Sequence, residues 1–167
     1  MNCLVADRGL TEYPEGLRLQ EAARQQVQNG VYDGILLLLE HWPVITVGRA
    51  GGRENLRPGR EKLPEQAAVV HLTDRGGNIT CHNPGQIVGY PIFNLSRWRQ
   101  DAHWYVGCLE EVLIRVLADY GLAAGRKACY TGVWVGNEKI AAIGVSIRRW
   151  ITGHGFAMNV ANDLSLF

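Results

Sequence analysis

The chain has 167 residues, of which 47% are hydrophobic and 20% charged; this composition suits one folded globular domain and excludes a disordered chain. Its net charge of +1 gives no signal for nucleic acid, and no apolar run suits a signal peptide or a membrane span. The cysteines include no C-x-x-C pair and suggest no disulfide framework, which favours a cytoplasmic protein without structural zinc; they are Cys3, Cys81, Cys108 and Cys129.

Residues 14–29 predict the first helix. Proline suits its first turn, and Gly30 can end it. Leu17, Ala22 and Val27 can share part of one helical face, which would pack against the rest of the domain.

Three strands and a long loop follow this helix. The apolar run at 34–40 predicts a buried strand, and the β-branched residues at 44–47 predict a second. Residues 48–65 are polar and rich in glycine, proline and arginine, so they predict a long loop of the kind that often carries function. Residues 67–73 predict a third strand.

The middle of the chain predicts a strand and the clearest helix. Within the strand at 86–95, Gly89 and Pro91 indicate a bend or a sheet edge. Residues 101–120 keep a 3.6-residue period, and Gly121 is a natural terminator. The apolar side chains with this period are Tyr105, Cys108, Leu109, Val112, Leu113, Val116, Leu117 and Tyr120.

The last part of the chain predicts a hairpin and a final strand. Residues 132–135 and 139–147 are joined by a short Gly-Asn-Glu turn, and 151–160 predicts the last strand. Strands connected mostly by hairpins around two helices predict an α+β fold with mixed, mostly antiparallel sheets and flanking helices. No repeat or linker divides the chain, so we expect a single domain over 1–167.

Glycine-rich segments stand out at 48–53, 75–86, 141–145 and 153–159. The second, RGGNITCHNPGQ, packs three glycines and a proline into twelve residues. None is a phosphate-binding P-loop or a dinucleotide fingerprint. Each alone fits ordinary turn chemistry, whereas together they predict a pocket in which bare backbone lies against a long, thin ligand.

Lys139 is the ionisable residue with the clearest two interpretations. It precedes the apolar run 140–145, so partial desolvation would lower its pKa and make it useful as an acid or base. It also follows the hairpin turn, where an exposed lysine is equally ordinary.

Histidines and cysteines in the glycine-rich segments favour a lining or structural role. Cys81 and His82 are adjacent on an extended chain and point to opposite faces, so they do not suggest a nucleophile–base pair. His154, between two glycines, fits either a pocket wall or a loop hydrogen bond. A metal site made of His71, Cys81, His82 and His154 has no supporting ligand spacing, and we expect none.

Arginines alternate with tryptophan at 97–99 and 148–150. They fit an ordinary solvated surface, or a basic rim for an acidic protein partner whose binding would weaken on charge reversal at Arg148 and Arg149. No nucleic-acid-reading module is present in the sequence.

Four segments together resemble one family, the octanoyltransferases of lipoate biosynthesis, also called the lipoate-protein ligase B family. They are LLLLEHWPVITVGR (36–49), RGGNITCHNPGQIVGYPI (75–92), GVWVGNEKIAAIGVSIRRWITGHGFAMNV (132–160) and DLSLF (163–167). The resemblance covers nearly the whole chain. It implies the fold shared by the catalytic domains of biotin and lipoate protein ligases.

The resemblance also implies which residues bind the acyl group and which act on it. Lys139 would lower the pKa of a nucleophilic cysteine. The implied substrate-binding residues are Arg75, Gly76, Gly77, Asn78, Ile79, Thr80, Cys81, His82, Ala142, Ile143, Gly144, Gly155, Phe156 and Ala157. Glycines there would allow close approach of the chain, and backbone N–H groups would face the thioester carbonyl.

The implied reaction moves an octanoyl group from acyl carrier protein, through a cysteine thioester, to a lysine of lipoyl domains. The acceptors would be the lipoyl domains of 2-oxoacid dehydrogenases and the glycine cleavage H protein, with no nucleic acid or membrane involved. No cofactor is expected, because the thioester is already activated.

The family's nucleophile lies in a Pro-Cys-Gly segment shortly after the stretch that matches 163–167. We therefore expect it beyond Phe167, in a longer parent chain; the other interpretation is a catalytically inactive relative. Two further functions stay open: an ATP-dependent lipoate or biotin ligase, against which the missing phosphate loop argues, and a non-catalytic module that binds acyl groups or their carriers.

Overall fold

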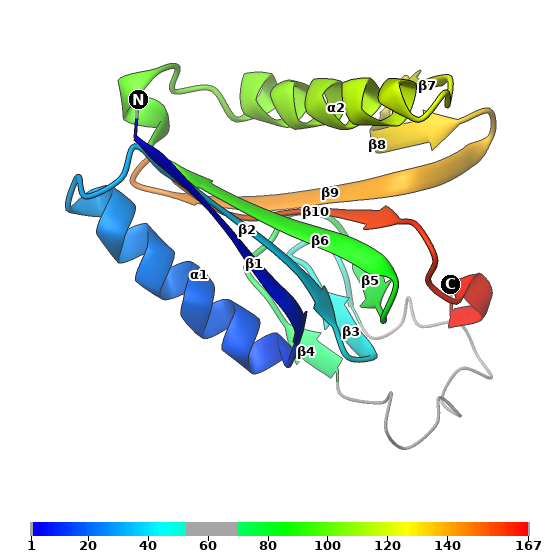
Figure 1. The fold of residues 1–167 in the computed structure, drawn as a ribbon, viewed down its shortest axis with the longest axis horizontal. Helices are drawn as coiled ribbons and strands as arrows, with labels where there is room; N and C mark the ends of the chain where they lie inside the picture. Colours follow the sequence, from blue (N-terminus) through cyan, green and yellow to red (C-terminus); the bar gives the residue numbers. More distant parts are fainter. Residues whose placement is uncertain (1, 53–69, 167) are drawn as a thin grey trace.

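A computed structural model describes residues 2–52 and 70–166 (Figure 1). The strands are β1 (Cys3–Thr11), β2 (Gly34–His41), β3 (Val44–Val47), β4 (Val70–Leu72), β5 (Ile79–His82), β6 (Gln86–Phe93), β7 (Ala124–Lys127), β8 (Tyr130–Val135), β9 (Glu138–Arg148) and β10 (Ile151–Asn159). The helices are α1 (Tyr13–Gln28) and α2 (Ala102–Asp119), and short 3₁₀ turns cover Leu95–Arg97 and Leu164–Leu166.

The strands form two sheets. The larger has the order β1-β2-β6-β10-β9-β8-β7, and the smaller has the order β4-β3-β5. Only β1–β2 and β3–β4 pair in parallel among the described strands; the other pairs are antiparallel. The predicted α+β class with mixed, mostly antiparallel sheets is therefore confirmed.

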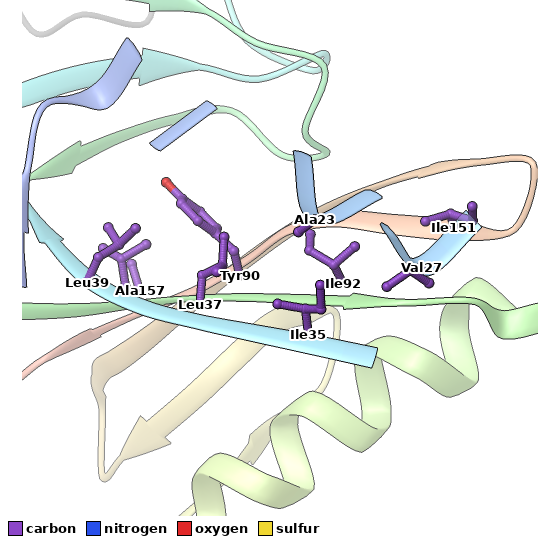
Figure 2. Close-up of a cluster of buried hydrophobic side chains, with 10 residues drawn as sticks. Ala23, Val27, Ile35, Leu37, Leu39, Tyr90, Ile92, Ile151 and Ala157 are labelled. Carbon is purple, nitrogen blue, oxygen red and sulfur yellow. The ribbon is translucent and has the colours of Figure 1, made fainter. Parts of the chain in front are cut away.

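The two helices cover opposite faces of the larger sheet (Figure 1). α1 packs on β2, β6 and β10, on the same side as the smaller sheet, whereas α2 packs on β7, β8 and β9. Under α1, Val27 meets Ile35 and Ile92 in an apolar cluster that extends along the sheet to Tyr90 and Leu39 (Figure 2). This cluster stabilises the face of the sheet on which the site described below is built.

α1 agrees with the predicted helix to within one residue at each end. Pro14 lies in its first turn, and Gly30 follows its end with a φ of +75°. The predicted face is only partly right, since Val27 is buried and Leu17 half-buried but Ala22 is exposed. The neighbouring Ala23 faces the sheet instead.

α2 begins where predicted, because the carboxylate of Asp101 accepts a hydrogen bond from the Trp104 N–H at 3.0 Å. The row that faces the sheet is Tyr105, Leu109, Leu113 and Leu117. The other half of the predicted face is wrong: Val112 is 55% exposed and Tyr120 is 81% exposed. A helix that lies on one sheet buries a narrow stripe, so the flanking apolar row stays in solvent.

Most of the predicted strands are present, but β6 is not an edge strand. It lies between β2 and β10, and its pairing with β10 stops at Gly89. Pro91 pairs with Leu36 of β2 but lies two residues beyond the last residue that pairs with β10, so its missing N–H breaks no ladder bond with β10. Residues 53–65 of the predicted loop and 67–69 of the predicted strand lie outside the described residues.

Three strands were not predicted. β1 carries Asp7, Arg8 and Gly9 and is an exposed edge strand with an irregular register there, so it lacks an alternating pattern. β5 lies inside the glycine-rich segment, and β7 is only AGRK. Neither described helix combines the length and the hydropathy needed to cross a lipid bilayer.

Replacing Gly155 with alanine should destabilise the fold by about 2–3 kcal/mol. A methyl group at 155 would overlap the carbonyl oxygen of Gly89 and the ring of Pro91, where β10 crosses β6. Chemical denaturation measures the loss. Gly107→Ala is the control, since its added methyl meets nothing within 4 Å and alanine favours the helix; we expect a gain of about 0.5–1 kcal/mol. Equal stabilities for the two variants would contradict this.

Candidate active site

A cavity of about 1170 Å³ lies where the two sheets meet. Its wall comes from the loop between β4 and β5, from β5, β6, β8, β9 and β10, and from residues that follow β10. The wall mixes apolar side chains such as Val88, Ile143 and Phe156 with tyrosine, histidine and lysine. A space of this size and mixed lining is large enough for a medium-chain acyl group and part of its carrier.

Nearly all the predicted site residues line this one cavity. They are Arg75, Gly77, Asn78, Ile79, Thr80, His82, Lys139, Ala142, Ile143, Gly144, Gly155, Phe156 and Ala157. Gly76 and Cys81 do not line it. The structure therefore brings together segments that are far apart in the sequence.

The glycine-rich loop between β4 and β5 lines the cavity and also contacts the backbone of other segments. The Gly76 N–H donates to the Val145 carbonyl at 2.9 Å, and the Gly77 carbonyl accepts from the Ala50 N–H at 3.1 Å. A methyl group on Gly144 would lie 2.8 Å from the Gly76 carbonyl oxygen. The glycines thus let the loop between β4 and β5 pack closely against β9, in addition to lining the cavity.

Arg75 holds this junction from inside. Its guanidinium donates to the Thr46 carbonyl at 2.8 Å, to the Thr46 hydroxyl at 2.9 Å and to the Gly76 carbonyl at 3.0 Å. Among the described residues no carboxylate pairs with it. Burial lowers its pKa, yet a guanidinium stays charged, so the cavity wall carries a buried positive charge.

His82 is a buried, neutral imidazole in the cavity wall. Its Nδ1 lies 2.7 Å from Oε1 of Gln86, whose amide nitrogen donates to Asn159. The Gln86 oxygen therefore accepts, and His82 carries its proton on Nδ1. Burial lowers its pKa to about 3. This leaves Nε2 as a hydrogen-bond acceptor.

Tyr13 and Tyr90 continue the same wall. The Tyr90 hydroxyl lies 2.7 Å from Nε2 of His41, and Nδ1 of His41 lies 2.8 Å from the Thr11 carbonyl. The carbonyl fixes the proton on Nδ1, so Tyr90 donates to Nε2. Burial lowers the pKa of His41 to about 4 and raises that of Tyr13 to about 12. This end of the cavity is therefore uncharged except for Arg75.

His154 also lines the cavity, from an unusual backbone position. Its φ is +53°, and its N–H donates to the Gln20 side chain at 2.7 Å. Its Nε2 lies 2.7 Å from the Asp74 carboxylate, so the proton is on Nε2. Burial nonetheless lowers its pKa. The pocket-wall interpretation and the hydrogen-bond interpretation of this residue therefore both hold.

Lys139 lies at the start of β9. The residue as a whole is exposed, but its ammonium end lies 5.2 Å from the centre of the Trp134 ring. A methyl group at Gly132 would be 3.1 Å from its Cε. Desolvation lowers the Lys139 pKa, and the charge of Glu110 opposes that change. Lys139 lines the same cavity as Arg75 and His82.

Sequence reasoning missed several residues of the wall. Tyr13 reaches the cavity from α1, whereas Tyr90 and Gln86 both reach it from β6, and none has a local pattern that would have identified it. Cys129, to which no function was assigned, also lines the cavity, from a turn with a φ of +67°. Cys108, one of the apolar residues with the helical period, is half-buried on α2.

The arginines beside tryptophan are mostly paired within the chain. Arg97 pairs with Asp33, and Arg99 pairs with Asp101 at 3.0 Å. Arg148 lies 3.4 Å from the carboxylate of Asp74. The basic rim for an acidic partner stays a prediction. In the part of the chain that the structure describes, no three His, Cys, Asp or Glu side chains gather as a metal site.

Comparison with known proteins gives both a fold and a family. A lipoate protein ligase from T. acidophilum, described as putative and solved with bound lipoic acid, superposes with a TM-score of 0.76 at 17% identity; the match covers 100% of this chain and 71% of that one. A lipoate-protein ligase A bound with ATP gives 0.73 at 15% identity, over 99% and 68%. At these identities the likeness shows the shared fold.

Sequence relatives are much closer. An octanoyltransferase of Thermoanaerobacter sp. (strain X514) is 52% identical over 160 residues, which are 95% of this chain and 70% of the relative. One of Solibacter usitatus is 48% identical over 166 residues, 99% and 76%. The model of the lipoyl protein ligase A/B catalytic domain matches residues 12–167. The chain therefore belongs to the lipoyl protein ligase A/B catalytic-domain family, and its close relatives there are octanoyltransferases.

Proposed function

We propose that the cavity holds an octanoyl group while the protein transfers this group from acyl carrier protein to the lysine of a lipoyl domain, in lipoate biosynthesis. The observation that carries this proposal is the meeting of the segments 75–82, 142–144 and 155–157 with Lys139 around one cavity. No local feature of these segments requires them to lie together. An acyl-transfer site does require it, because the acyl-binding residues and the acid–base group must surround one substrate.

The apolar part of the wall suits the tail of the acyl chain. Val88, Ile143 and Phe156 offer side chains without hydrogen-bonding groups, and burying each methylene of the tail contributes about 0.8 kcal/mol. The neutral His82 and Tyr90 close the wall without a charge that the tail would have to desolvate. Binding therefore rests on shape and burial.

Lys139 supplies the charge at the reacting end. In the scheme the acyl group passes through a cysteine thioester, as the family resemblance implies. A nearby ammonium favours the thiolate form of that cysteine and the negative charge that develops on the thioester oxygen during attack. With a lowered pKa, Lys139 exchanges protons more readily with the leaving thiol and the incoming amine.

The donor and acceptor proteins are part of the same proposal. Acyl carrier protein would deliver the octanoyl thioester, and the acceptors would be lipoyl domains of 2-oxoacid dehydrogenases and the glycine cleavage H protein. The thioester already stores the free energy of acyl transfer, so the reaction needs no nucleotide. We also propose that residues 1–167 form a single domain. The substrate-binding roles of the residues in the cavity wall are proposals too.

Incubation of the full-length protein, which includes the cysteine expected after the stretch 163–167, with octanoyl-acyl carrier protein and a lipoyl domain tests the proposal. We expect the mass of the lipoyl domain to rise by one octanoyl group, at a rate that added ATP leaves unchanged. A control reaction offers free octanoate and ATP in place of the carrier thioester. Product in the control alone would identify an ATP-dependent ligase, and product in neither reaction would identify a non-catalytic module.

A further inference from the structure

Glu110 is a buried carboxylate that points from α2 toward the sheet. Only 9% of the residue is exposed, and a carboxylate so buried is stable only with hydrogen-bonding partners. Its Oε1 accepts from the Gly132 N–H at 3.0 Å, and its Oε2 accepts from Nε of Arg126 at 3.0 Å. The first of these partners belongs to a strand next to the cavity.

Gly132 has a backbone that only glycine adopts readily. Its φ is +126°, and a methyl group there would lie 2.5 Å from the Ala141 carbonyl oxygen. Its N–H is directed to the Glu110 carboxylate, and the β8–β9 register shifts between Val133 and Trp134. The carboxylate therefore holds β8 beside the shift in its pairing register with β9.

The Lys139 side chain packs beside Gly132. Its Nζ is 3.4 Å from the place where a Gly132 Cβ would be, and it also lies over Trp134. No carboxylate comes within 4.0 Å of this ammonium in the described ranges, so Glu110 acts on it through Gly132 and across a longer distance. The three residues form one chain of contacts from α2 to the cavity.

We propose that Glu110 is a positioning residue for octanoyl transfer: it fixes Gly132, and Gly132 in turn carries the Lys139 ammonium at the cavity. Its charge also favours the protonated lysine, against the desolvation that removes the proton. Glu110 itself touches no reacting atom. The proposal rests on the proposed function for its kinetic consequences only.

Several other titratable groups surround the same ammonium, and the experiment has to separate them from Glu110. Lys127 lies over the same Trp134 ring, at 4.8 Å from its centre. Arg126 neutralises part of the Glu110 charge and also bonds Glu111 at 3.0 Å. The remaining groups on adjoining elements are Cys129, Tyr130 and Glu138.

The chain offers a direct measurement, because its three lysines are Lys62, Lys127 and Lys139. With lysine labelled at the ε-carbon, heteronuclear NMR follows the titration of each lysine as a separate signal. The signal that disappears in Lys139→Arg is that of Lys139. Glu110→Gln keeps the shape and an oxygen acceptor for the Gly132 N–H but removes the charge. We expect the Lys139 midpoint to move to lower pH.

Glu111→Gln is the matched control, because Glu111 is the next residue on α2 and also pairs with Arg126 but does not contact Gly132. We expect no comparable movement of the Lys139 midpoint in this control. Glu110→Asp keeps the charge on a shorter stem and should fall between wild type and Glu110→Gln. It also serves as the second variant if Glu110→Gln folds poorly.

Kinetics give the second measurement. In Glu110→Gln we expect kcat to fall about 3- to 10-fold with KM little changed, and the alkaline side of the rate profile to move to lower pH. A purely structural Glu110 would lower the melting temperature and leave both titrations alone. That result, or an equal shift in Glu111→Gln, would overturn the proposal. The NMR titration needs no acyl donor, so it decides the proposal even if octanoyl transfer is not found.

Discussion

Lys139→Ala should lower the rate of octanoyl transfer by about 10²- to 10⁴-fold, the usual contribution of a positioned acid–base group. Lys139 lines the cavity together with the proposed acyl-binding segments, and removing its ammonium takes away both a proton and a positive charge at the proposed place of the thioester. The measurement is the single-turnover appearance of octanoylated lipoyl domain. KM for the carrier thioester should change far less, since the acyl tail contacts other residues.

Lys127→Ala is the matched control for this loss. Lys127 lies over the same Trp134 ring, at 4.8 Å from its centre, but does not line the cavity. We expect nearly wild-type transfer from it. Lys139→Arg keeps the charge but gives up a proton far less readily, so it should recover only part of the rate. An undiminished rate in Lys139→Ala would refute the role of this lysine.

The protein should lose about 4 kcal/mol of folding stability between pH 7.5 and pH 5, which is a large share of the 5–15 kcal/mol typical of a domain. Burial lowers the pKa of His41 to about 4 and that of His82 to about 3. In the unfolded chain both imidazoles bind a proton below about pH 6.5, whereas in the folded chain they do not. Over that window each contributes about 2 kcal/mol, at about 1.4 kcal/mol per pH unit.

Urea denaturation at a series of pH values measures this loss. The stability is fully present above about pH 6.5 and falls as the pH drops toward 4, because there the unfolded state gains protons that the folded state refuses. His41→Gln should be less stable at pH 7.5 but should depend less on pH across the window. His103→Gln changes an exposed residue of α2 and should leave the profile as it is. A flat wild-type profile down to pH 5 would show that the two rings are not buried as described.

Much of the fold could be predicted, because its main elements have strong local periods. The α2 helix, the apolar β2 strand and the hairpin of β8 and β9 all follow from spacing and turn residues. β1 could not be predicted, because an edge strand half in solvent does not need alternating apolar residues. The central place of β6 was also hidden, since Pro91 normally indicates an edge.

Some residues of the candidate site could be identified from the sequence, and others only from the structure. The glycine-rich segments and Lys139 were singled out from residue types and from the family resemblance, and all but Gly76 and Cys81 of the proposed set line one cavity. Tyr13 and Tyr90 were not found, because a tyrosine in a helix or strand looks the same whether it faces a core or a ligand.

The sequence by itself determined the periodic elements, the positions of the glycine-rich segments, and the family to which the chain belongs. These follow from local sterics and from short motifs, which a linear sequence contains in full. The tertiary structure decided which half of the α2 apolar stripe is buried, and it decided that Gly76 bonds to β9 while Gly77 lines the cavity. It also decided that the Glu110 carboxylate meets Gly132 beneath Lys139. Each of these depends on contacts between residues distant in the chain, and burial and electrostatics are properties of those contacts rather than of any local segment.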